Sequence, residues 1–255
     1  MIHSSAVIDP AAQIGPETEI GPCCVIGPDV VIGSGCVLDS HVTVAGPTTI
    51  GDGNHFFPYS SIGQRSQDLK YTVEPTYLEI GDYNSFREFC TVNRGTAPGS
   101  KTTIGGHNNF LAYSHVAHDC TVGNHTIFSN NGTLAGHVIV EDHAVIGGLS
   151  GVHQFCRIGC HAILGGCTKI VQDVAPYMIA DGNPAEIRGI NQVGLERRGF
   201  SAEEIRTLRE AYRLLCRANL NVKQACEKIR IELPPNAHLD HLLAFIEASK
   251  RGIVR

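Results

Sequence analysis

The chain repeats with a period of six residues over most of its length. Aliphatic residues or Phe recur at every sixth position from Ile2 to Ile170, and only Asp68, Glu74 and Pro98 break the series. The residue two places before each repeated position is usually small. Side chains two apart on a strand point to the same face, so both positions should face one core. A period this short predicts short strands joined by tight turns.

Three such strands would close a triangular coil of eighteen residues, and stacked coils would pair as parallel strands about 4.8 Å apart. The composition suits such a core, because aromatics make up 6% of the chain and Trp is absent. Several of the ten Cys fall on the small inward position, and no CxxC pair occurs. We therefore expect these thiols to fill the core rather than to bind metal; they are Cys24, Cys36, Cys120 and Cys156.

Two polar segments interrupt the repeat, one near 64–79 and one near 93–103. Loops that leave a rigid scaffold often carry function. The repeat ends by 190, which predicts a β-helix domain over 1–190 and a helical domain over 191–255. Within the second domain, Ser201 and Glu204 form a capping box, and further helices are expected near 222–232 and 237–250.

Charge and hydropathy exclude several classes of function. The net charge of −5 gives no basic surface for nucleic acid. The N-terminus shows no signal-peptide pattern, and no apolar run has the length of a membrane span. We expect a soluble, cytoplasmic protein.

Histidines fall into two groups when they are placed on the eighteen-residue coil. The first group should stack as a ladder on one corner: His107, His125, His143 and His161. The second group should lie on another edge: His115, His118, His137 and His153. Gly136 follows His118 by eighteen residues, and Gln154 follows Gly136 by eighteen, so these three should be vertical neighbours.

The second group is the better candidate site. A histidine with its ordinary pKa of about 6.5 can take a proton from a hydroxyl at neutral pH. Asp119 could orient the His118 ring, and the N–H of Gly136 could stabilise an oxyanion. The alternative is that turns tolerate polar residues and the clustering is accidental. For the ladder, a structural role, a subunit interface or adventitious metal binding is favoured over catalysis.

Several segments resemble the UDP-N-acetylglucosamine O-acyltransferase family of hexapeptide-repeat acyltransferases. These segments extend along essentially the whole chain: SQDLKYTVEPT (66–76), HVAHDCTVGN (115–124), LAGH (134–137), VHQFCRIG (152–159), GNPAE (182–186), NQVGLERRGFS (191–201) and the terminal RGIVR. The resemblance implies an all-β left-handed parallel β-helix followed by a small α-helical C-terminal domain. Periodicity alone does not give this handedness, since most parallel crossovers are right-handed.

The resemblance also implies a reaction. An (R)-3-hydroxyacyl group would pass from acyl carrier protein to the 3-hydroxyl of UDP-N-acetylglucosamine, the first step of lipid A biosynthesis, with no cofactor and no metal. It assigns His118 as the general base, Asp119 as its orienting partner and Gly136 as the oxyanion donor. Substrate contacts are implied for Asp68, Lys70, His115, His137, His153, Gln154, Asn191, Arg197 and Arg198, as well as for Glu196.

Family members are homotrimers whose active sites lie between subunits, so the resemblance implies that assembly here. Gly166 matches the position that measures acyl chain length, and its small size favours a longer acyl group. One departure is Asn93, which stands where the family usually has His. The base is elsewhere, so the departure bears on the contacts of the second loop and not on the reaction.

Three alternatives remain open at this stage. The related N-acyltransferase acylates an amine, but it normally carries an extra N-terminal domain and Asn after its base. A zinc carbonic anhydrase on the same fold needs two His spaced H-x4-H, and no two His here are five apart. The third alternative is a non-enzymatic scaffold, which the grouping of His118 with Gly136 disfavours.

Overall fold

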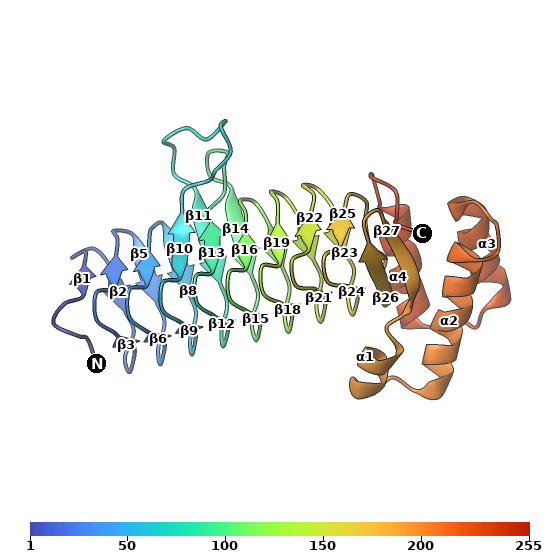
Figure 1. Ribbon diagram of the computed structural model, residues 1–255, viewed down its shortest axis with the longest axis horizontal. Helices are drawn as coiled ribbons and strands as arrows, with labels where there is room; N and C mark the ends of the chain where they lie inside the picture. Colours follow the sequence, from blue (N-terminus) through green and yellow to red (C-terminus); the bar gives the residue numbers. More distant parts are fainter.

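The computed structural model describes residues 1–255 and forms a long three-sided prism with helices at its C-terminal end (Figure 1). Each face of the prism is a sheet of short, mainly parallel strands. The first sheet contains β1 (Val7–Ile8), β4 (Val25–Ile26), β7 (Thr43–Val44), β10 (Ser61–Gln64), β13 (Thr91–Asn93), β16 (His115–Val116), β19 (Thr133–Leu134), β22 (Gly151–Val152) and β25 (Lys169–Ile170).

The other two faces follow the same order along the prism. The second sheet contains β2 (Gln13–Ile14), β5 (Val30–Ile32), β8 (Thr48–Ile50), β11 (Tyr77–Ile80), β14 (Lys101–Ile104), β17 (Thr121–Val122), β20 (Ile139–Val140) and β23 (Arg157–Ile158). The third contains β3 (Glu19–Ile20), β6 (Val37–Leu38), β9 (His55–Phe56), β12 (Ser85–Phe86), β15 (Asn109–Phe110), β18 (Ile127–Phe128), β21 (Val145–Ile146), β24 (Ile163–Leu164), β26 (Met178–Gly182) and β27 (Ala185–Ile190).

The predicted eighteen-residue coil is confirmed by the strand register. Val116 pairs with Leu134, and Leu134 pairs with Val152. Both repeated positions face the core, as expected: Phe128 and Cys120 are fully buried. The four Cys assigned to the core all have side chains without exposed surface.

Gly follows the repeated position because neighbouring coils approach closely there. A Cβ added at Gly15 would lie 2.5 Å from the carbonyl carbon of Gly33 in the next coil. The left-handed position of each turn is a different one, and non-glycine residues usually occupy it. His, Asn and Asp tolerate that conformation better than most side chains, which explains why they recur there, although aromatic residues such as Tyr59 and Phe89 also occupy it.

Three corners join the sheets, and we name each by what it carries. The loop corner joins the first sheet to the second and includes Asp119, His137 and Phe155. The histidine corner joins the second sheet to the third and carries the predicted ladder. The aromatic corner joins the third sheet to the first and carries the stacked rings of Tyr59, Phe89 and Tyr113.

The two interruptions of the repeat both leave the prism at the loop corner. Strands continue to Gln64 and resume at Tyr77, and they continue to Asn93 and resume at Lys101. The irregular segments, 65–76 and 94–100, are therefore shorter than predicted. They project together from one edge of the prism (Figure 1).

The tail differs from the prediction in two elements. Helices α2 (Ala202–Cys216), α3 (Val222–Glu232) and α4 (Ala237–Glu247) correspond to the three expected, and the capping box is present. A short helix α1 (Gln192–Arg197) precedes them, and β26 and β27 form an unpredicted antiparallel pair. At six residues, α1 is too short to show an apolar period.

The C-terminal segment closes the last coil. The N–H of Val254 donates to the carbonyl of Asp173 at 2.9 Å, and Ile253 forms a parallel bridge with the same residue. This pairing covers strand edges that would otherwise invite association with another chain. None of the helices has the length and hydropathy required to cross a bilayer.

Candidate active site

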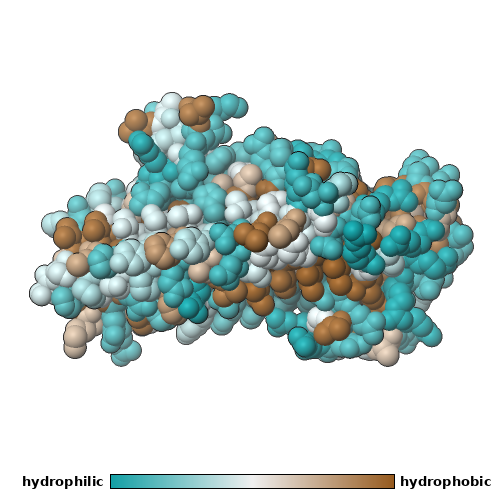
Figure 2. Space-filling view, in the orientation of Figure 1, coloured by the Kyte–Doolittle hydropathy of each residue, from teal (hydrophilic) through white to brown (hydrophobic).

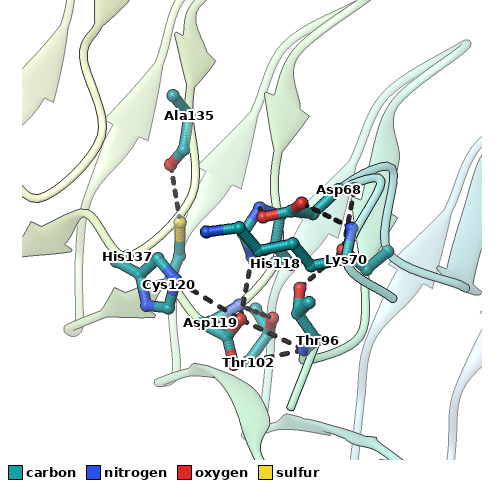
Figure 3. Close-up of polar contacts among 10 residues, drawn as sticks. Asp68, Lys70, Thr96, Thr102, His118, Asp119, Cys120, Ala135 and His137 are labelled. Carbon is teal, nitrogen blue, oxygen red and sulfur yellow. Dashed lines mark hydrogen bonds and ion pairs between the residues drawn. The ribbon is translucent and has the colours of Figure 1, made fainter. Parts of the chain in front are cut away.

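His118 and Asp119 form an oriented pair at the loop corner (Figure 3). The Nδ1 of His118 lies 2.8 Å from Oδ2 of Asp119. The ring is largely buried, with 8% of the residue exposed. Asp119 adopts φ of 58°, the left-handed conformation that this turn requires. That conformation turns the two adjacent side chains toward each other, so the predicted orienting role has the geometry it needs.

The second loop and its strand hold Asp119 in place. The N–H of Thr96 donates to Oδ2 of Asp119 at 3.1 Å, and the Asp119 N–H donates to the Thr102 hydroxyl at 2.8 Å. Burial by itself would raise the pKa of Asp119, but the neighbouring Ser100 hydroxyl, His118, His137 and Thr96 outweigh it and lower that pKa. The carboxylate therefore stays ionised near neutral pH and favours the tautomer of His118 with its proton on Nδ1.

The opposite nitrogen of His118 points toward the first loop. Its Nε2 lies 4.0 Å from Oδ2 of Asp68, too far for a hydrogen bond. The N–H of Asp68 donates to the Ser66 hydroxyl, which is bonded in turn to Thr96 of the second loop. Lys70 donates its backbone N–H to Asp68 Oδ1 at 2.9 Å. The two loops thus hold a carboxylate beside Nε2 without occupying its lone pair.

Gly136 lies directly against the His118 ring in the next coil. A Cβ added at Gly136 would lie 2.5 Å from Nε2 of His118, so no larger residue fits without moving the ring. The N–H of Gly136 donates no hydrogen bond within the chain, whereas its carbonyl accepts from Phe155. A free N–H next to the His118 ring is the arrangement that oxyanion stabilisation requires.

The other predicted residues of this group lie around the pair at different distances. His137 contacts His118 edge-on at 5.2 Å between ring centroids, and its Nε2 lies 3.7 Å from Asp119 Oδ2. His115 bonds the Thr91 hydroxyl at 2.7 Å, and burial, followed by the charge of His118, lowers its pKa. His153 instead contacts the Gln154 carbonyl and Arg251.

Asp119 and His137 border a pocket of about 390 Å³ between the loops and the prism. Residues that line it include Asp68, Lys70, Thr96, Asp119, His137, Gln154 and Phe155. His118, Asp119 and His137 also present ligand atoms within 4.8 Å of one another, so this group could accept a cation. Of the lining residues, Thr96 carries no sequence signal, because it belongs to an irregular loop.

A second set of predicted residues lies at the histidine corner and not beside His118. Asn191, Arg197 and Arg198 line a pocket of about 250 Å³ together with His125, His143 and His161. Asn191 has a structural role here, since its Oδ1 caps α1 and its Nδ2 donates to the carbonyl of His161.

The ladder itself forms as the spacing predicts. Successive rings from His107 to His161 stack with centroid separations of 4.9, 4.9 and 4.7 Å. Burial, the adjacent His143, Arg198 and His238 together lower the pKa of His161 to about 4. At neutral pH this ring is therefore uncharged and acts as a packing element.

Two further predicted positions can now be located. Gly166 lies at the aromatic corner, between β24 and β25, on a different edge of the chain from His118. Asn93 is 3% exposed, and its Nδ2 donates to the Arg65 carbonyl at 3.2 Å. The residue that departs from the family pattern therefore ties the bases of the two loops together.

A three-sided parallel β-helix that carries an oriented His–Asp pair and a free N–H in the next coil has the features of a hexapeptide-repeat acyltransferase. The comparisons agree with this class. A family model described as UDP N-acetylglucosamine O-acyltransferase, domain 2, matches residues 173–254. The acyl-[acyl-carrier-protein]–UDP-N-acetylglucosamine O-acyltransferase of Burkholderia orbicola is 48% identical over 260 residues, with 100% of this chain and 99% of that protein covered.

Solved structures extend the agreement to the fold. LpxA from Acinetobacter baumannii superposes with a TM-score of 0.96 at 47% identity, covering 100% of this chain and 99% of that one. UDP-N-acetylglucosamine O-acyltransferase from Moraxella catarrhalis gives a TM-score of 0.95 at 44% identity, with the same coverage of both chains. The chain belongs to the UDP-N-acetylglucosamine O-acyltransferase family and is an acyltransferase. The predicted left-handed parallel β-helix is confirmed.

Proposed function

We propose that this protein transfers an (R)-3-hydroxyacyl group from acyl carrier protein to the 3-hydroxyl of UDP-N-acetylglucosamine, the first step of lipid A biosynthesis. The relative from Burkholderia orbicola bears the name acyl-[acyl-carrier-protein]–UDP-N-acetylglucosamine O-acyltransferase. The observation that carries the proposal is the His118 ring, held through Nδ1 by Asp119 while Nε2 remains unbonded beside Gly136. That arrangement is suited to deprotonating a hydroxyl next to a developing oxyanion.

In the first step, Nε2 of His118 takes the proton of the sugar 3-hydroxyl while the oxygen attacks the thioester carbonyl. Asp119 stabilises the imidazolium that forms. The negative charge that develops on the carbonyl oxygen accepts a hydrogen bond from the N–H of Gly136. No bond to the enzyme is formed, so one histidine serves the whole reaction.

In the second step the tetrahedral intermediate collapses and the carbon–sulfur bond breaks. The imidazolium of His118 returns its proton to the departing thiolate of the carrier. Asp68 and Lys70 of the first loop, with His137 and Gln154 of the prism, border the pocket in which the sugar would sit. These steps use only protons and side chains of the chain, so we propose that no cofactor or metal takes part in the chemistry.

We further propose a homotrimer with active sites between subunits. Residues assigned to one site lie at three different corners of a single chain: His118 at the loop corner, Arg197 and Arg198 at the histidine corner and Gly166 at the aromatic corner. One substrate can contact them together only if neighbouring chains supply different corners. Outward strand residues such as Ile127 and Ile139 are also apolar and exposed, and an apolar stripe follows the prism in Figure 2.

The donor would approach from the helical end. A pocket of about 540 Å³ lies beside His137 and Phe155 and is lined by Arg157, Lys250 and Arg251. Acyl carrier protein is acidic, so a local basic surface would attract it despite the net charge of −5. We place the reaction in the cytoplasm, where acyl carrier protein is found.

The direct test is to incubate the purified protein with UDP-N-acetylglucosamine and a panel of 3-hydroxyacyl carrier proteins, with and without a chelator. Acylated sugar nucleotide detected by mass, insensitive to chelator and absent with His118→Ala, would support the reaction and give the chain length. Absence of product with every donor would refute it. A product seen only with a glucosamine-amine acceptor would indicate the related N-acyltransferase.

A further inference from the structure

A second group of metal-ligating side chains lies away from the active site, where the helical tail meets the prism. Glu141 and Cys160 come from turns of successive coils, and His241 comes from α4. Nε2 of His241 lies 2.8 Å from Oε2 of Glu141. The N–H of Cys160 donates to the same oxygen at 2.8 Å. One carboxylate oxygen thus contacts the His241 ring and the Cys160 backbone, which come from segments far apart in the sequence.

We propose that Glu141, Cys160 and His241 bind a thiophilic divalent cation of the Zn²⁺ type and thereby fasten α4 to the β-helix. The ligand atoms, a carboxylate oxygen, Sγ and a ring nitrogen, lie within 4.8 Å of one another. In a tetrahedral zinc site with ligands about 2.0 to 2.3 Å from the ion, the ligand atoms are about 3.3 to 3.8 Å apart, so side-chain rotations that adjust the separations would complete the site. The proposal does not depend on the acyltransferase reaction.

The chemistry of the three ligands favours zinc over magnesium or calcium. Sulfur and imidazole nitrogen are ligands for zinc and similar transition metals, whereas Mg²⁺ and Ca²⁺ require oxygen. With a thiolate, a carboxylate and a neutral histidine, a divalent cation is fully neutralised. The thiol gives up its proton when the metal binds.

The surroundings leave room for a fourth ligand and orient the carboxylate. The group opens onto a cavity of about 570 Å³ that is also lined by Tyr177 and His238. Water can therefore complete a tetrahedron. Arg157 lies 3.9 Å from the other oxygen of Glu141, Oε1, which positions the carboxylate with Oε2 toward Cys160 and His241. The metal would replace the present hydrogen bond between Oε2 and the His241 ring. The same Arg157 packs on the Phe245 ring of α4, so it reinforces the junction that the metal would close.

Cobalt(II) is the probe for the test, because a thiolate ligand to cobalt gives a strong near-ultraviolet absorption. The full-length protein, stripped with a chelator, is titrated with Co²⁺. We expect one equivalent per chain to produce the thiolate band, and Cys160→Ser to abolish it. His241→Ala should weaken cobalt binding at least about tenfold, because one of three protein ligands is lost. Zn²⁺ should displace the cobalt and raise the melting temperature of the wild type but not of Cys160→Ser.

Two control variants separate this site from the other candidates. Cys167→Ser removes an exposed thiol, and His137→Ala removes a ligand from the sulfur-free group beside His118. Both should retain the band. Absence of a band in the wild type, loss of the band in Cys167→Ser, or cobalt bound without a band would each overturn the proposal. Should Cys160→Ser fail to fold, His241→Ala decides the matter, because that side chain is 43% exposed and its loss should be tolerated.

Discussion

Two corners of one prism carry columns of histidine, yet they have different chemical character. At the histidine corner the rings stack on one another and border Arg197 and Arg198. At the loop corner His118 contacts a carboxylate at one nitrogen and leaves the other unbonded. The difference comes from the two loops, which leave the repeat only at the second of these corners and bring Asp68 and Thr96 to it.

The comparison shows how a repeat acquires a site. An uninterrupted repeat places similar residues in similar surroundings, so its side chains pack against copies of themselves. Segments that interrupt the repeat bring side chains of other types into contact with the repeated residues. The loops hold Asp119 and line the pocket beside it, and neither effect can arise from stacking alone.

The largest expected effect is the loss of activity when the base is removed. His118→Ala should lower the rate by about 10³-fold, within the range of general-base contributions. His107→Ala, the matched change in the ladder, should retain most of the activity, because that ring lines neither the pocket beside Asp119 nor the pocket beside Arg197. Steady-state assay of both variants, with circular dichroism to verify folding, measures the contrast. Equal losses in the two variants would remove the distinction between the corners.

A smaller effect is expected from adding a single methyl group beside the base. Gly136→Ala should lower activity by about 10- to 100-fold, because its Cβ would displace the His118 ring. The thermal midpoint should fall only slightly, since the ring does not belong to the hydrophobic core cluster. Gly189→Ala is the control, because nothing lies within 4 Å of a Cβ added there. A Gly136→Ala enzyme with the wild-type rate would contradict the packing argument.

A substitution at the aromatic corner should change the selectivity for acyl chain length and not the rate of the reaction. Gly166→Met should shift the preferred donor toward a shorter acyl chain, because the longer side chain would occupy the end of the acyl cleft. A competition assay with a mixture of 3-hydroxyacyl carrier proteins reads the preference by product mass. An unchanged preference would exclude Gly166 from the measurement of chain length.

The smallest expected effect concerns the stability of the ladder at acid pH. The pKa of His161 is about 4 in the fold, below its ordinary value of about 6.5. Since the unfolded chain binds the proton more readily, stability is present above pH 6.5 and is lost as the pH falls toward 4. His161→Asn should reduce the drop in melting temperature between pH 7.5 and pH 5 by about 4–8 °C, which corresponds to about 2 kcal/mol. An identical drop in both proteins would argue against a half-buried, neutral ring.

The sequence by itself determined the prism, because a six-residue period allows only one choice of inward positions. It also determined which residues share a corner wherever the repeat is uninterrupted, so the vertical order of His118, Gly136 and Gln154 could be derived by counting. The left-handed backbone conformation of Asp119 is less easily predicted from the sequence, since several residue types tolerate that conformation.

Only the tertiary structure decided what the loops and the tail contribute. Three features depend on segments without periodicity: the distance between Asp68 and His118, the hydrogen bond from Thr96 to Asp119, and the position of Arg197 beside the histidine ladder. The same is true of His241, which meets Glu141 across a hundred residues of sequence. In a repeat, the constant period determines where each residue lies. Contacts at the end or the edge of the prism instead depend on how irregular segments fold back onto it, and no local sequence pattern predicts that.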